Sequence, residues 1–110
     1  MAIYMFTFEI MLDDASDMTA NFRANNPNPN GVIGGFFSAE TVQEVLDQDG
    51  CEGLRYYFAR ATETSDITIV LTGVDASGND MYEGELRERS LPCPSMCSSE
   101  NPLNSNVTPE

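Results

Sequence analysis

The sequence predicts an α+β fold in which a two- or three-stranded antiparallel sheet carries an N-terminal helix and a second short helix on one face. Two stretches rich in β-branched and aromatic residues predict a hairpin, and apolar residues at spacings of three and four predict helices. At 110 residues the chain has room for one core. We place a single α+β domain in residues 1–91 and a Pro/Ser/Asn-rich tail in residues 92–110.

The N-terminal helix is predicted from Tyr4 to about Asn25. Its apolar residues fall on one helical face, while most of the acidic residues lie elsewhere. The first few residues could instead begin as a strand, because periodicity does not decide so short a run. Residues 25–31 then end any helix, since proline restricts the residue before it and Asn and Gly favour turns. The apolar face consists of Tyr4, Phe8, Met11, Leu12, Ala15, Met18 and Phe22.

The second helix is predicted to begin after Ser38, which stands in an N-cap position. Val42, Val45 and Leu46 form its apolar stripe. The following Asp-Gly pair at residues 49–50 provides a plausible exit in the left-handed conformation.

The hairpin is predicted from residues 54–61 and 66–74, joined by the four polar residues between them. The aromatic run in the first segment and the β-branched residues in the second are typical of strands. Residues 75–80 supply a turn that Asp75 can cap. A third strand is expected to run from 81 towards 91.

Composition and charge exclude several classes of function. The absence of histidine and lysine removes Ser-His-Asp triads, Cys-His pairs, Walker-type lysines and histidine-ligated metals within one copy of the chain. A formal net charge of −13, with five arginines and no basic stripe, argues against nucleic acid as a partner. The eighteen Asp and Glu residues still allow a carboxylate acid–base pair. We expect no cofactor, and we favour a protein without catalytic activity over an enzyme.

The sequence also predicts that the protein has no membrane partner and resides in the cytoplasm. No stretch approaches the ~20 apolar residues of a membrane span. The apolar beginning lacks a basic region and a small-residue cleavage pattern, so we predict no signal peptide. The odd cysteine count (Cys51, Cys93 and Cys97) suits a reducing compartment. Secretion by another route is left open.

Six short blocks follow one another in a distinctive order. They are TANFR at 19–23, GFF at 35–37, LDQDGC at 46–51, GLRYY at 53–57, GVDASGND at 73–80 and CPSMC at 93–97. Together they resemble an uncharacterised family of small proteins common in Bacteroidetes-type bacteria, over residues 19–103. The resemblance implies no particular activity. Members of that family often have a basic residue after the Phe-Phe pair, where this chain has Ser38.

The three cysteines are the first candidate metal ligands. Cys51, Cys93 and Cys97 could supply three thiolates to zinc, with Asp or water as the fourth ligand. The alternative is a buried structural Cys51 beside a helix end, with two thiols in the tail that pair reversibly or stay free. We favour this alternative.

The acidic segment 75–85 is the second candidate, because its oxygen ligands are grouped as in calcium loops. In an EF-hand-like frame that starts at Asp75, however, Asp80 stands where Gly is required and Leu86 stands where Glu is required. A turn that caps its own backbone is therefore favoured over a metal site.

The candidate interaction residues are Arg55, Tyr56, Tyr57, Asp75 and Asp80. The Arg55 guanidinium can pair with Asp80 or Asp75 and lock the hairpin, or it can recognise a carboxylate of a partner. We favour the structural ion pair. The tyrosines are more often core residues than a platform for a ligand.

We interpret the chain as a non-catalytic interaction or self-assembly module that uses an exposed strand edge or an aromatic surface. Its partner would be a second copy or another protein. One alternative is a small calcium- or zinc-binding protein or a carboxylate-dependent hydrolase centred on residues 75–85. Another is an acidic inhibitor that mimics DNA, which would need carboxylates spaced like phosphates over one face.

Overall fold

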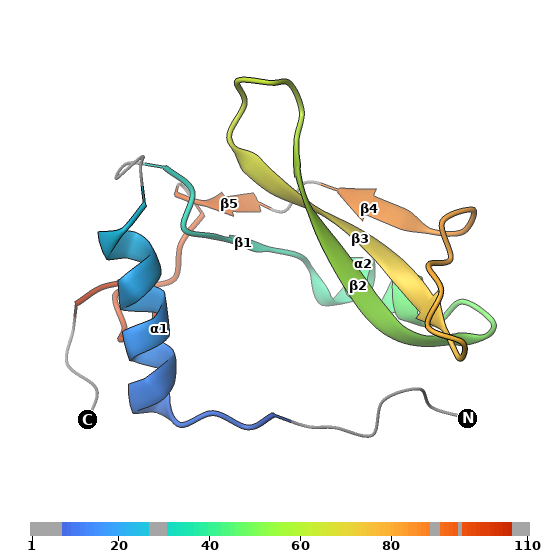
Figure 1. The fold of residues 1–110 in the computed structure, drawn as a ribbon, viewed down its shortest axis with the longest axis horizontal. Coiled ribbons are helices and arrows are strands. Elements are labelled where there is room, and N and C mark those ends of the chain that lie inside the picture. Colours follow the sequence, from blue (N-terminus) through green and yellow to red (C-terminus); the bar gives the residue numbers. More distant parts are fainter. Residues whose placement is uncertain (1–7, 27–30, 89–90, 95, 107–110) are drawn as a thin grey trace.

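The computed structural model of the chain describes residues 8–26, 31–88, 91–94 and 96–106, and it confirms the predicted α+β class (Figure 1). The elements follow one another as α1-β1-α2-β2-β3-β4-β5. The strands form two antiparallel sheets, one with the order β2-β3-β4 and one that pairs β1 with β5. Within these residues, no helix combines the length and the apolar character needed to cross a membrane.

The three-stranded sheet is built on the predicted hairpin. β2 (Cys51–Arg60) and β3 (Ile67–Asp75) pair antiparallel along their whole length, with one irregularity in register between Cys51 and Gly53. Successive side chains on each strand point to opposite faces, so the sheet has two faces with different residues. β3 is the central strand, and its residues 71–74 are all buried.

The third strand is shorter than expected. β4 (Leu86–Glu88) pairs with β3, but the segment before it turns back on itself, since the Gly84 N–H donates to the Met81 carbonyl at 3.0 Å. The predicted strand 81–91 therefore becomes a turn followed by three paired residues. Residues 89–90 lie outside the described part of the chain.

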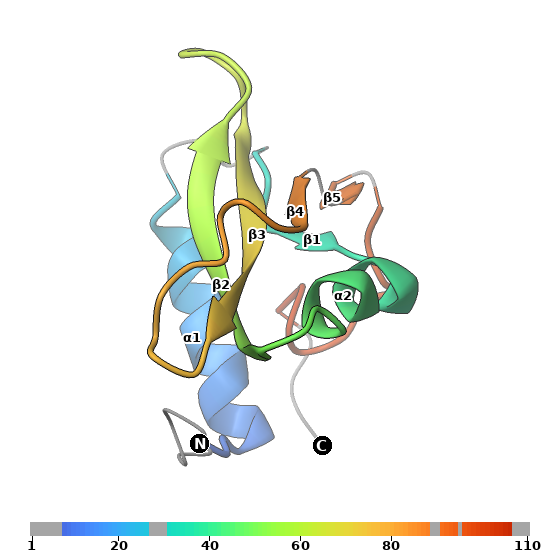
Figure 2. The same ribbon diagram turned by 90° about the vertical axis from the view of Figure 1, so that its right-hand side faces the viewer.

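α2 (Ala39–Leu46) packs against one face of this sheet, as Figure 2 shows. The helix begins where the sequence predicts, because the Ser38 hydroxyl accepts a hydrogen bond from the Thr41 N–H at 3.1 Å. Val45 is fully buried, and Leu71 on β3 is 5% exposed. Val74, three residues further along β3, is also buried, but its side chain points to the opposite face of the sheet.

α1 (Leu12–Ala24) differs from the expectation in its length and in its packing. Residues 8–11 are not helical, and residues 4–7 lie outside the described part of the chain. None of the helix residues is buried, and Figure 1 shows α1 standing apart from the three-stranded sheet. Of the two predicted helices, α2 is the one that covers the sheet.

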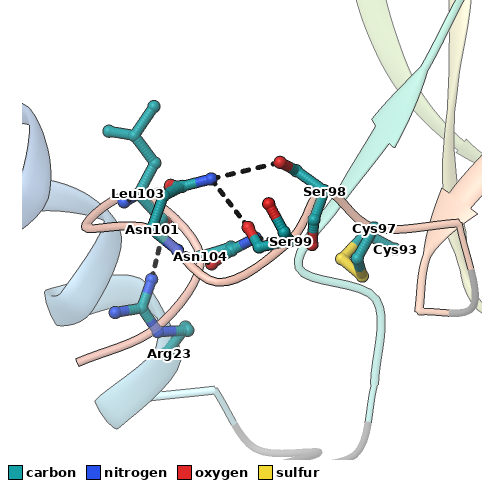
Figure 3. Close-up of a disulfide and its surroundings, with 8 residues drawn as sticks. All are labelled: Arg23, Cys93, Cys97, Ser98, Ser99, Asn101, Leu103 and Asn104. Atoms are coloured by element: carbon teal, nitrogen blue, oxygen red, sulfur yellow. Dashed lines mark hydrogen bonds between the residues drawn. A yellow bond between two sulfur atoms is a disulfide. The ribbon is translucent and has the colours of Figure 1, made fainter. Parts of the chain in front are cut away.

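The second sheet joins segments that are far apart in the sequence. β1 (Gly34–Phe36) pairs with β5 (Leu91–Cys93), so the predicted tail begins inside a strand. The following segment folds against α1, where Arg23 donates to the carbonyl oxygen of Leu103 at 2.8 Å (Figure 3). Arg23 also donates to the carbonyl oxygen of Ser105 at 3.0 Å. Much of the segment predicted as a tail is thus held by hydrogen bonds.

Candidate functional site

Arg55, Tyr57 and Asp80 form a polar cluster on one face of the three-stranded sheet. Arg55 and Tyr57 are two residues apart on β2, so their side chains point to the same face. Arg55 Nη1 lies 2.6 Å from Asp80 Oδ1, and the Tyr57 hydroxyl donates to Asp80 Oδ2 at 2.5 Å. Each carboxylate oxygen therefore has its own donor. The predicted ion pair between Arg55 and Asp80 is confirmed.

The turn after β3 holds Asp80 in place. Asp75 Oδ1 accepts hydrogen bonds from the Ser77 N–H at 2.9 Å and the Asn79 N–H at 3.0 Å. Gly78 has a φ of 85°, a conformation that residues with a Cβ rarely adopt. Asp75 thus caps its own turn, as the sequence predicts, and its role is to position Asp80.

The cluster fixes the charge state of its members. The hydrogen bond from Tyr57 and then that from Arg55 lower the pKa of Asp80 below its ordinary value. The hydrogen bond to Asp80 is also the main cause of the raised pKa values of Tyr57 and Arg55. None of the three groups is therefore suited to exchange a proton near neutral pH, which favours a structural role over acid–base catalysis.

Tyr56 lies on the opposite face of β2 from this cluster. Leu54, Tyr56 and Phe58 alternate along the strand and point to the same face, with exposed fractions of 41%, 58% and 71%. The rings of Tyr56 and Phe58 meet edge to face, with centroids 5.7 Å apart. We call these three residues the β2 apolar stripe. Sequence reasoning selected Tyr56 and missed Leu54 and Phe58, although their spacing of two residues is the signal that identifies the stripe.

The outer edge of β2 is free in the described part of the chain. β2 is the terminal strand in the order β2-β3-β4, and the described residues include no strand that pairs with its other side. The edge runs for ten residues. The polar cluster, the apolar stripe and an unpaired backbone edge thus belong to the same strand.

An apolar cavity of about 300 Å³ lies between α1, β1 and the end of the hairpin where the turn joins β2 to β3. No charged residue lines it. Such a cavity can accept an apolar group but has no means to orient a charged substrate. The main apolar lining residues are Phe22, Val32, Ile33, Phe58, Ile67 and Ile69.

The cysteines are not arranged as a metal site. Cys93 and Cys97 are joined in a disulfide (Figure 3). Cys51 is a free cysteine that is half-buried rather than buried as predicted, and its thiol donates to the Gly53 carbonyl at 3.2 Å. The disulfide removes the zinc candidate with three thiolates, because two of the sulfurs are bonded to each other. Across the described ranges, no group of three or more His, Cys, Asp or Glu residues could hold a metal ion.

The disulfide also bears on the predicted compartment. Disulfides persist mainly in oxidising environments. The bond between Cys93 and Cys97 therefore weakens the argument for a reducing cytoplasm that rests on the odd cysteine count. A cytoplasmic location stays a prediction.

A scan against protein-family models and searches of curated proteins and of solved structures found no match. The resemblance to small proteins of Bacteroidetes-type bacteria therefore stays a prediction. The function has to be argued from the surfaces described above.

Proposed function

We propose that this chain is a non-catalytic interaction or self-assembly module whose contact surface is the free edge of β2 together with the β2 apolar stripe. The observation behind this proposal is the imbalance between apolar residues in the core and on the surface. In the described residues, seventeen large apolar side chains are exposed. The buried apolar residues are Val45, Leu71, Val74 and Cys93.

The composition of β2 supports an edge that accepts another strand. An unpaired edge offers a row of N–H and C=O groups to another chain, and proteins commonly block such edges with lysine, proline or very short strands. β2 contains no proline, its charged residues are Glu52 and Arg60 near its ends and the ion-paired Arg55, and at ten residues it exceeds the ~5–6 residues of a common strand. Exposed aromatic side chains beside this edge add the kind of apolar surface that association buries.

The carboxylates of residues 75–85 give less support to a hydrolase. Asp75 accepts hydrogen bonds from its own turn, and both oxygens of Asp80 are engaged by Arg55 and Tyr57. A general acid–base pair needs carboxyl groups whose pKa values are pushed apart towards the working pH. The lowered pKa of Asp80 is the opposite of what a general acid requires.

The proposal is tested by following association over a range of protein concentrations, with native mass spectrometry, sedimentation velocity and pull-downs. Phe58→Lys places a charge in the stripe, and Tyr82→Lys is the matched control, since both aromatic side chains are 71% exposed and neither change should unfold the protein. We expect the wild type to associate with itself or with another protein. Phe58→Lys should weaken this association, and Tyr82→Lys should leave it unchanged.

Two results would contradict the proposal. One is a wild-type chain that stays monomeric at high concentration and retains no protein in pull-downs. The other is an equal loss of association in the two lysine variants, which would place the contact surface away from β2.

A further inference from the structure

We infer that the partner at the β2 edge is a second copy of this chain, whose own β2 pairs antiparallel in a register centred on Tyr56. The inference rests on the proposed function, because it requires the β2 edge to be a contact surface. A two-fold axis perpendicular to the sheet relates the two strands and makes the contact self-complementary. Residues equally far before and after Tyr56 then face each other across the pair.

The charges at the two ends of β2 are complementary in this register. Near the ends of the paired strands, Glu52 of one copy comes close to Arg60 of the other, and the symmetry repeats the contact; Glu52 is the extra residue at the irregularity between Cys51 and Gly53, so this contact depends on the reach of the two long side chains. Both side chains are exposed, and neither makes an ion pair or a side-chain hydrogen bond in the described part of the chain. Opposite charges across an antiparallel ladder stabilise the pairing. Glu52 of each copy therefore gains Arg60 of the other copy as its ion-pair partner.

The apolar stripe matches itself in the same register. Leu54 lies opposite Phe58 twice, and the two Tyr56 residues meet at the axis. An axis perpendicular to the sheet keeps each face continuous, so all these side chains fall on one face of the combined sheet. Exposed apolar groups of the two copies would thus shield one another from water, as cross-strand pairs do within a sheet.

The neighbouring registers lack this match. The register of the two β2 strands can change only in steps that keep side chains of the same face opposite each other. A register centred on Arg55 places that arginine opposite its own copy, which is unfavourable. A register centred on Tyr57 places Arg60 opposite Leu54 and leaves Glu52 opposite an uncharged threonine. Of the three, the register centred on Tyr56 is the one that opposes unlike charges.

The distribution of net charge also favours this edge for a second copy. At a formal net charge of −13, two copies repel each other over most of their surface. β2 contains Glu52 and Arg60, and its Arg55 is paired with Asp80, so this edge carries no net negative charge, whereas α1, α2 and β3 each contain more acidic than basic residues. Two copies therefore meet at β2 with less repulsion than at those elements.

Charge reversal tests the predicted pairs. Arg60→Glu and Glu52→Arg should each raise the dimer dissociation constant about tenfold, because each change puts two like-charged pairs in place of two favourable ones. The double variant Glu52→Arg/Arg60→Glu should restore an affinity near that of the wild type. Glu52→Arg also makes the chain less negative, so a general effect of net charge would strengthen association, whereas the register predicts a loss.

Disulfide trapping tests the register itself. In a Cys51→Ser background, Tyr56→Cys should form a covalent dimer under mild oxidation, because the two cysteines meet at the axis. Phe58→Cys is the control. Its two cysteines would lie four residues apart along the ladder, or ~13 Å, beyond the ~7 Å between Cα atoms that a disulfide spans.

The outcomes separate this inference from the proposed function. If the wild type self-associates but Phe58→Cys crosslinks as well as Tyr56→Cys, or the double reversal does not restore affinity, the register is wrong and the proposed function stands. If the chain is monomeric alone and binds a different protein through β2, the second copy is excluded and the proposed function again stands. If it binds nothing, both fail.

Discussion

The two helices differ in what covers their apolar stripes, although the same sequence periodicity predicts both. In α2 the stripe lies on the three-stranded sheet and Val45 is fully buried. In α1 no residue is buried, and Met18 is 63% exposed. Periodicity therefore predicts a helix but not the surface that covers it, because coverage depends on contacts distant in sequence.

The difference divides the molecule into two parts of unequal packing. α2 with the three-stranded sheet contains most of the buried apolar side chains. α1 is tied to the C-terminal segment by the hydrogen bonds of Arg23. Since buried apolar area is the main source of stability, we expect the free energy of unfolding to depend on the first part and very little on the second.

The largest effect is expected from removing a core side chain beneath α2. Leu71→Ala should lower the free energy of unfolding by about 3 kcal/mol, because it deletes buried methyl groups and leaves a cavity. Met18→Ala on α1 should change it by less than about 0.5 kcal/mol. Urea denaturation followed by circular dichroism measures both. A comparable cost for Met18→Ala would show that α1 is packed in solution and would remove the distinction between the helices.

The next effect is expected at the start of α2. Ser38→Ala removes the hydroxyl that accepts the Thr41 N–H and should cost about 1 kcal/mol of unfolding free energy. Ser77→Ala serves as the control, since the Ser77 hydroxyl makes no hydrogen bond in the described residues. The same denaturation experiment applies. Equal free energies of unfolding for Ser38→Ala and Ser77→Ala would mean that the Ser38 cap does not stabilise the fold.

A smaller, pH-dependent effect is expected from the polar cluster. The pKa of Asp80 is lowered in the folded chain, so its contribution to stability is present above the ordinary aspartate pKa, near 4, and is lost as pH falls through the lowered folded value. Asp80→Asn should therefore be less stable than the wild type at neutral pH. The difference in unfolding free energy between the variant and the wild type should become smaller below about pH 4.

Asp49→Asn provides the control for this titration, because Asp49 is exposed and has no side-chain partner in the described residues. Its free energy of unfolding should stay parallel to that of the wild type at every pH. If the difference in unfolding free energy between Asp80→Asn and the wild type does not change with pH, the lowered pKa of Asp80 does not contribute to stability.

Local patterns were enough to predict the hairpin, the cap of α2 and the turn capped by Asp75. The cap and the turn depend on residues close together in sequence, where capping and turn preferences act directly, and each strand of the hairpin can be recognised from its own residues. The pairing of β1 with β5 was not predictable in this way. Its three-residue strands are too short for alternation to be visible, and β1 begins with two glycines, which carry no side-chain pattern.

The candidate site was predictable in part for the same reason. The opposite charges of Arg55 on a predicted strand and of Asp75 and Asp80 in a predicted turn pointed to an ion pair with one of the two carboxylates. The hydrogen bond from Tyr57 to the same carboxylate was not predicted, because it depends on the distance from β2 across the sheet to the turn. The exposure of Phe58 was also missed, since an aromatic strand is usually buried and only the tertiary fold shows that Phe58 stays 71% exposed while it lines the apolar cavity.

The smallest effect on global stability is expected from separating α1 from the C-terminal segment. Arg23→Ala removes the donors to Leu103 and Ser105 but should change the free energy of unfolding by only a few tenths of a kcal/mol, because these bonds lie near the surface. Hydrogen exchange resolves the local consequence. The amides of Asn104 and Ser105, which donate to the Asn101 carbonyl, should exchange faster in the variant, while those of β3 should not change.

Arg87→Ala is the matched control for this exchange experiment. Arg87 pairs with Glu44 and Glu85 beside the three-stranded sheet, so its loss should leave exchange in the C-terminal segment unchanged. If Arg23→Ala has no effect on the amides of 104 and 105, the segment is held by contacts other than Arg23. If it speeds exchange in β3 as well, the two parts of the molecule unfold together and the contrast drawn from the two helices does not extend to their stability.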